Sequence, residues 1–65
     1  MNTRVAIGNK IAEIRNQKKM SQQELADLTG LTQNNISRIE QGKYSFGIDI
    51  LFRIVDVLGK NVEIV

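Results

Sequence analysis

The sequence predicts an all-α fold of four helices followed by a short C-terminal β-strand. Three observations predict it. Apolar residues recur at spacings of three and four in separate segments, as they do on the buried face of a helix. Three of those segments are followed by Gly30, Gly42 and Gly59, at the position where helices often end. Residues 61–65 alternate between polar and apolar side chains, which is typical of a strand.

The middle of the chain predicts two helices joined by a short turn. Ser21 and Glu24 are spaced as a capping box, so a helix is expected to begin at Ser21 and end at Gly30. Thr32 is suited to cap the next helix, which is expected to end at about Gln41. Two helices with so short a connection form a helix-turn-helix unit.

The flanking helices are expected at residues 4–18 and 49–58. Either Gly47 or Asp49 is suited to cap the last helix. Apolar spacing predicts that the four helices bury a common set of side chains, namely Ile7, Ile11, Ile14, Leu25, Ala26, Leu28, Ile36, Ile39, Leu51, Ile54, Val55 and Leu58.

The composition excludes several classes of function. The chain has 65 residues, which indicates one domain spanning residues 1–65. It contains no His and no Cys, so it lacks disulfides, the commonest transition-metal ligands and the usual catalytic nucleophile and base. No enzyme activity, metal or cofactor is therefore expected. The absence of Cys, and of a secretory signal at the N-terminus, favours a cytoplasmic location.

The exposed side of the third predicted helix carries an unusual set of residues. At 100° per residue, an arc of about 140° holds Gln33, Asn34, Ser37, Arg38 and Gln41, while the isoleucines lie opposite. Solvated helices more often expose Glu and Lys. Amide side chains match the edge of adenine and Arg matches that of guanine. The arc alone favours base recognition and a solvated polar face about equally.

Charge is distributed unevenly along the chain. The net charge is +2, but residues 1–20 hold five Lys or Arg against one Glu. A basic cluster of this kind favours contact with DNA phosphates.

The segment from Ser21 to Lys43, SQQELADLTGLTQNNISRIEQGK, resembles the helix-turn-helix of the lambda-repressor/Cro-like, or XRE-type, transcriptional regulators. Ala26 matches the small residue where the two helices cross, and Gly30 matches the glycine of the turn. The resemblance extends over nearly all of residues 4–58. It implies a four-helix lambda-repressor-like DNA-binding domain, with its helix-turn-helix at residues 21–41.

The resemblance also implies roles for individual residues. Base contacts are expected from Gln33, Asn34, Ser37 and Arg38. Phosphate contacts are expected from Gln22, Thr32, Asn35, Gln41, Lys43 and Tyr44. A structural ion pair is expected between Arg15 and Glu40; otherwise Arg15 would contact a phosphate or lie free on the surface.

The C-terminal part departs from the family. No proline precedes the fourth helix, and the strand at 61–65 stands in place of a fifth helix. This resembles short regulators, including some antitoxins, whose C-terminal strand pairs across a dimer. Residues at about 48–65 are therefore expected to form a homodimer interface through Ile48, Phe52, Val57, Val62 and Ile64. A frayed tail is the alternative.

The sequence predicts a small homodimeric transcriptional regulator, most simply a repressor, that binds a palindromic double-stranded operator. One alternative is an antitoxin that also binds a toxin protein and represses its operon. Another is a protein-interaction module that does not bind DNA. No membrane contact and no small-molecule effector are expected.

Overall fold

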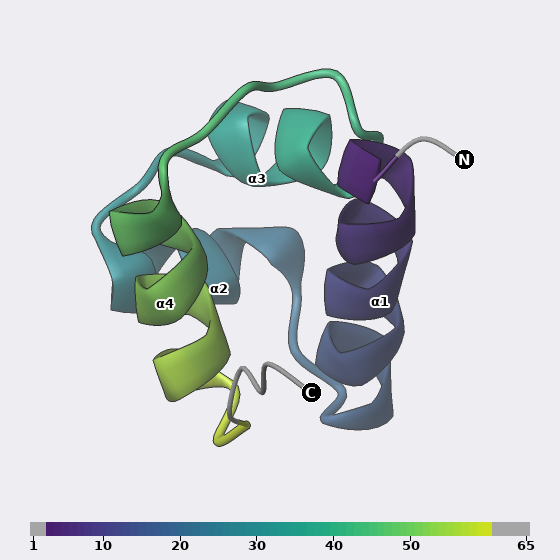
Figure 1. Ribbon diagram of the computed structural model, residues 1–65. Coiled ribbons are helices and arrows are strands. Elements are labelled where there is room, and N and C mark those ends of the chain that lie inside the picture. Colours follow the sequence, from purple (N-terminus) through teal and green to yellow (C-terminus); the bar gives the residue numbers. More distant parts are fainter. Residues whose placement is uncertain (1–2, 61–65) are drawn as a thin grey trace.

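The computed structural model describes residues 3–60, which form four helices. They are α1 (Thr3–Gln17), α2 (Gln22–Thr29), α3 (Gln33–Glu40) and α4 (Ile48–Val57). Figure 1 shows α3 at the top of the molecule, with α1 along one side and α4 along the other. The described residues contain no strand, and the prediction of a four-helix fold is confirmed. The predicted strand at 61–65, with Val62 and Ile64, lies outside these residues.

The helix-turn-helix begins where the capping signals predict. The Ser21 hydroxyl accepts from the backbone N–H of Glu24 at 3.0 Å, and the Glu24 carboxylate accepts from the N–H of Ser21 at 3.1 Å. The Thr32 hydroxyl accepts from the N–H of Asn35 at 3.1 Å. Both caps satisfy backbone donors that have no partner within the helix. The start of each helix is therefore fixed by local chemistry.

The fourth helix begins one residue earlier than expected. Its N-cap is Gly47, which has no side chain to accept a hydrogen bond, and Asp49 lies inside the first turn. Asp49 is therefore not the cap. Its carboxylate still lies near the N-terminus of α4, where a negative charge interacts favourably with the helix dipole.

The core contains side chains from every helix. Seven apolar residues are buried, namely Ile11, Leu25, Ala26, Ile36, Ile39, Ile54 and Leu58. The prediction that Leu28 is buried is wrong, since Leu28 is 60% exposed. Thr29 is buried instead, and its hydroxyl donates to the carbonyls of Leu25 and Ala26 at 2.8 and 3.2 Å. These bonds satisfy the buried hydroxyl, while Leu28 lies on the exposed side of α2.

The first helix lies very close to the end of α3. A Cβ atom on Gly8, which is buried, would be 2.3 Å from the carbonyl oxygen of Ile39 and 2.8 Å from that of Glu40. These are backbone atoms, so no side-chain rotation could relieve the contact. Glycine at position 8 thus sets the distance between α1 and α3.

None of the helices within residues 3–60 has the length and apolar character needed to cross a membrane.

Candidate nucleic-acid interface

The four residues expected to contact bases lie on the solvent side of α3. Gln33, Asn34 and Arg38 are exposed and Ser37 is half-buried. On the opposite side, Ile36 and Ile39 are fully buried. The helix therefore has one face fixed in the core and one face of polar side chains available to a partner.

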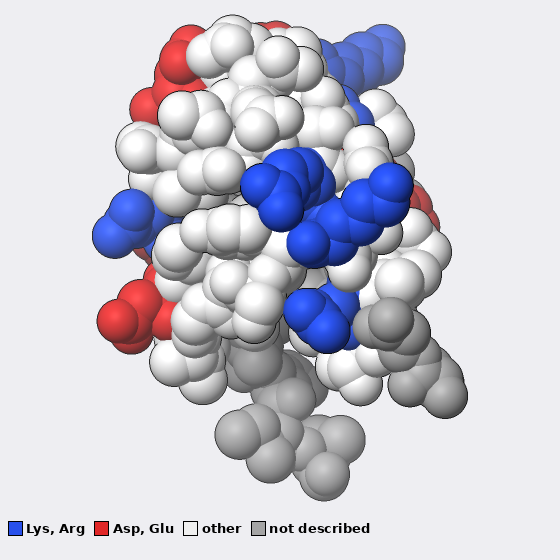
Figure 2. Space-filling model, turned by 90° about the horizontal axis from the view of Figure 1, so that it is seen from above, with Lys and Arg blue, Asp and Glu red and all other residues white. Residues whose placement is uncertain are grey.

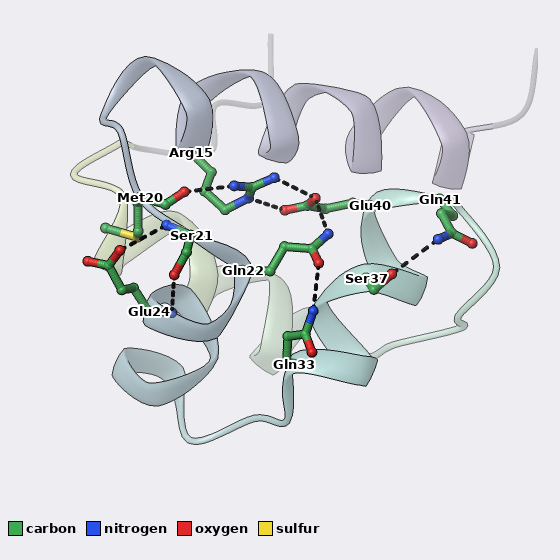
Figure 3. Close-up of polar contacts among 9 residues, drawn as sticks. All are labelled: Arg15, Met20, Ser21, Gln22, Glu24, Gln33, Ser37, Glu40 and Gln41. Atoms are coloured by element: carbon green, nitrogen blue, oxygen red, sulfur yellow. Dashed lines mark hydrogen bonds and ion pairs between the residues drawn. The ribbon is translucent and has the colours of Figure 1, made fainter.

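A buried ion pair holds α3 against α1. The Arg15 guanidinium donates from Nε to Glu40 Oε2 at 2.7 Å and from Nη2 to Oε1 at 3.1 Å (Figure 3). Its Nη1 donates to the carbonyl of Met20 at 2.7 Å. The side chains of Arg15 and Glu40 are 11% and 7% exposed. With two parallel bonds to the carboxylate and a third to the backbone, both buried charges are compensated.

The polar contacts continue from this pair to the surface of α3. Gln22 Nε2 donates to Glu40 Oε1 at 3.0 Å, and Gln22 Oε1 accepts from Gln33 Nε2 at 3.1 Å (Figure 3). Gln22 was expected to contact a phosphate. The structure places its amide between Glu40 and Gln33, so it fixes the orientation of Gln33. Contact between Gln22 and a phosphate stays a prediction.

The other residues expected to contact phosphates border the same face. Thr32 and Asn35 form the cap of α3, and Gln41 donates to the Ser37 hydroxyl at 3.1 Å. Lys43 is exposed, and Tyr44 is half-buried. All of them lie at the two ends of α3, flanking its exposed side chains.

Positive charge gathers on this part of the surface. Figure 1 shows α3 and the segment after it at the top of the molecule, and Figure 2 looks onto that face. Lys and Arg side chains lie near its middle and also at its edges, whereas Asp and Glu lie only toward its margins (Figure 2). Positive charge in the middle of a face favours the approach of a polyanion, and this face carries the residues expected to contact bases.

Sequence reasoning did not single out two residues that shape this surface. Gly8 sets the approach of α1 to α3, and an interior helical glycine is a signal of close backbone contact. Phe46 stacks on Tyr44, with ring centroids 6.4 Å apart. Two aromatic residues close together after the third helix were the available signal.

Among residues 3–60, no three Asp or Glu side chains lie close enough together to hold a metal ion.

Comparison with known proteins identifies this arrangement. The helix-turn-helix family matches residues 11–65 of the chain. The chain belongs to this family. The XRE-type resemblance is thereby confirmed, and the family consists of DNA-binding transcriptional regulators rather than enzymes.

Related helix-turn-helix regulators occur in several bacteria. The HTH-type transcriptional regulator PuuR of Escherichia coli, and that of Shigella flexneri, is 44% identical over 59 residues. The match covers 91% of this chain and 32% of PuuR, so the chain spans about a third of that protein's length. An uncharacterised HTH-type transcriptional regulator of Haemophilus influenzae is 36% identical over 64 residues, covering 98% of this chain and 65% of that protein.

Solved structures share the fold of this helix-turn-helix chain. The clp gene regulator ClgR from Corynebacterium glutamicum superposes with a TM-score of 0.88 at 25% identity, covering 91% of this chain and 76% of that one. The restriction-modification controller protein C.AhdI from Aeromonas hydrophila superposes with a TM-score of 0.83 at 26% identity. The match covers 88% of this chain and 83% of that one.

Proposed function

We propose that this chain binds double-stranded DNA in a sequence-specific manner, as a homodimeric transcriptional repressor. The observation that carries the proposal is the exposed face of α3, where amides, a hydroxyl and a guanidinium lie opposite the fully buried Ile36 and Ile39. The major groove of DNA is wide enough to admit a helix, and these groups complement the base edges within it.

The contacts of Gln33 suit it to recognise adenine. One N–H of its amide is engaged by Gln22. The second N–H and the carbonyl oxygen remain to pair with N7 and N6 of adenine. Because Gln22 is itself bonded to Glu40, the Gln33 amide is oriented before DNA arrives, and less side-chain freedom is lost on binding.

Lys43 and Arg38 are expected to act differently, although both are exposed cations near one end of α3. Arg38→Ala should weaken binding to the preferred site by about 1–3 kcal/mol and relax the preference at one base pair. Lys43→Ala should weaken binding to all duplexes alike and lower the slope of log affinity against log salt by about one. Fluorescence anisotropy with preferred and random duplexes measures both effects. Equal losses on the two duplexes for Arg38→Ala would contradict base recognition by Arg38.

Selection of binding sites from a random DNA pool tests the proposed function directly. A homodimer should select a palindrome whose half-sites are about 34–36 Å, or one helical turn, apart. Retention of no duplex at about 50 mM salt would show that the proposal is wrong, because phosphate contacts alone should hold DNA at that ionic strength.

The surface of α4 supports the homodimer. Ile48 and Phe52 are 63% and 47% exposed, whereas Val57 packs against the core of its own chain. Arg53 donates from Nη1 to the carbonyl of Thr29 at 3.2 Å, so that side of α4 faces α2. At 100° per residue, Ile48 and Phe52 lie about 100–140° away from Arg53, on a side of α4 that could meet a second copy.

Phe52→Ser is expected to shift the chain toward the monomer and to weaken binding to the palindromic site, because it removes a large apolar side chain from the interface. Leu28→Ser is the matched control. Leu28 is 60% exposed, but it lies on α2. Sedimentation equilibrium measures the dimer fraction. If both variants dimerise as the unmodified chain does, the interface does not include Phe52.

A further inference from the structure

An aromatic stack lies where α3 ends, beside its exposed face. The rings of Tyr44 and Phe46 are stacked, with centroids 6.4 Å apart and an interplanar angle of 14°. The guanidinium carbon of Arg38 lies over the Tyr44 ring, 5.7 Å from its centroid. Both rings pack against the hydrophobic core. The stack therefore connects an exposed side chain of α3 to the interior of the protein.

The backbone between Arg38 and Tyr44 holds this arrangement. Gly42 has a positive φ of 73°, and its N–H donates to the carbonyl of Ile39 at 3.0 Å. The N–H of Lys43 donates to the carbonyl of Arg38 at 2.9 Å. These bonds turn the chain back at the end of α3, as in a Schellman motif, and bring the Tyr44 ring to the side chain of Arg38.

We propose that Tyr44 is a positioning residue for DNA recognition, whose ring holds the Arg38 guanidinium ready to recognise a guanine. The proposal rests on the function proposed above. An aromatic ring attracts a guanidinium that lies over its face, and the N–H donors at the edge of the guanidinium remain free to form hydrogen bonds. Bidentate recognition of O6 and N7 of guanine uses that edge. Arg38 has no ion pair with any residue in the range 3–60, so the ring restrains its charged end.

This role differs from the phosphate contact expected of Tyr44. A phosphate contact would use the phenol hydroxyl and would strengthen binding to every duplex. Restraint of Arg38 uses the ring face and strengthens binding only where Arg38 meets its correct base. Ordering one long side chain before binding is worth about two- to tenfold in affinity. The two roles are separable because Phe retains the ring face and lacks the hydroxyl.

The experiment compares Tyr44→Leu with the matched variant Tyr44→Phe. Fluorescence anisotropy is used to titrate each with the selected duplex and with a duplex in which the base pair recognised by Arg38 is replaced. Tyr44→Leu should lose about two- to tenfold in affinity for the selected duplex and little for the other. Tyr44→Phe keeps the ring face and should discriminate between the two duplexes as the unmodified chain does, whatever its affinity for each. In an Arg38→Ala background, Tyr44→Leu should have no further effect on discrimination.

Several outcomes would overturn the proposal. Tyr44→Leu would lose affinity equally on both duplexes if the ring only supported the fold. Tyr44→Phe would lose discrimination between the duplexes if something other than the ring face positioned Arg38. If the unmodified chain binds both duplexes alike, the proposed function itself is wrong. Nuclear Overhauser contacts between the Tyr44 ring protons and Arg38 Hδ are expected in the unmodified chain, free and DNA-bound. Their absence would overturn the proposal without recourse to any variant.

Discussion

Arg15→Met is expected to lower the free energy of unfolding by about 3–5 kcal/mol, because it leaves the Glu40 carboxylate buried without its counter-ion. The Glu40 side chain is 7% exposed, and two of its hydrogen bonds come from Arg15. A chain of this length has a total stability of about 3–10 kcal/mol. The variant should therefore lose about a third of its stability or more, as measured by urea denaturation followed by circular dichroism.

The double variant Arg15→Met, Glu40→Leu separates the loss of the pair from the cost of an unpaired charge. Replacing both partners by apolar residues removes the buried charges together, so most of the lost stability should return. The hydrogen bond from Gln22 to Glu40 would be absent in the double variant, and Gln33 would lose its orientation. A double variant that is stable and yet discriminates poorly between duplexes would fit this account. A double variant less stable than Arg15→Met would contradict it.

The elements with local chemical signals could be predicted from the sequence. The capping box at Ser21, the Thr32 cap and the glycines after α2 and α3 fix their elements by interactions among residues five or fewer apart. The buried face of α3 followed from its periodicity, because Ile36 and Ile39 are the apolar residues of a short amphipathic helix. The exposed amides were identified by the same reasoning.

Features set by tertiary contact could not be predicted in the same way. Leu28 and Thr29 are neighbours on α2, and which of them faces the interior depends on how α2 packs against α3 and α4, which spacing along the sequence does not give. The position of Gln22 between Glu40 and Gln33 depends on how α2 meets α3. The aromatic stack depends on the turn after α3, which brings Tyr44 back to Arg38.

Gly8→Ala is expected to destabilise the fold by about 3 kcal/mol, at the upper end of the cost of overpacking, because the methyl group would meet backbone. The nearest atoms are the carbonyl oxygens of Ile39 and Glu40, at 2.3 and 2.8 Å. Relief requires α1 to move away from the end of α3. That movement would also stretch the contact between Gly42 and Val5, where a Cβ on Gly42 would be 2.6 Å from a Val5 methyl group.

Gly47→Ala is the matched control for this prediction. Its Cβ would have no atom within 4 Å, and its φ of −78° suits any residue. Alanine there should change stability by less than about 1 kcal/mol, because the lower entropy of the unfolded chain is opposed by the preference for Gly over Ala at an N-cap. Thermal denaturation at one protein concentration compares the two variants. If Gly8→Ala and Gly47→Ala have the same melting temperature, α1 does not lie as close to α3 as the structure shows. If Gly8→Ala alone is destabilised, the distance between α1 and the recognition helix is set by that glycine.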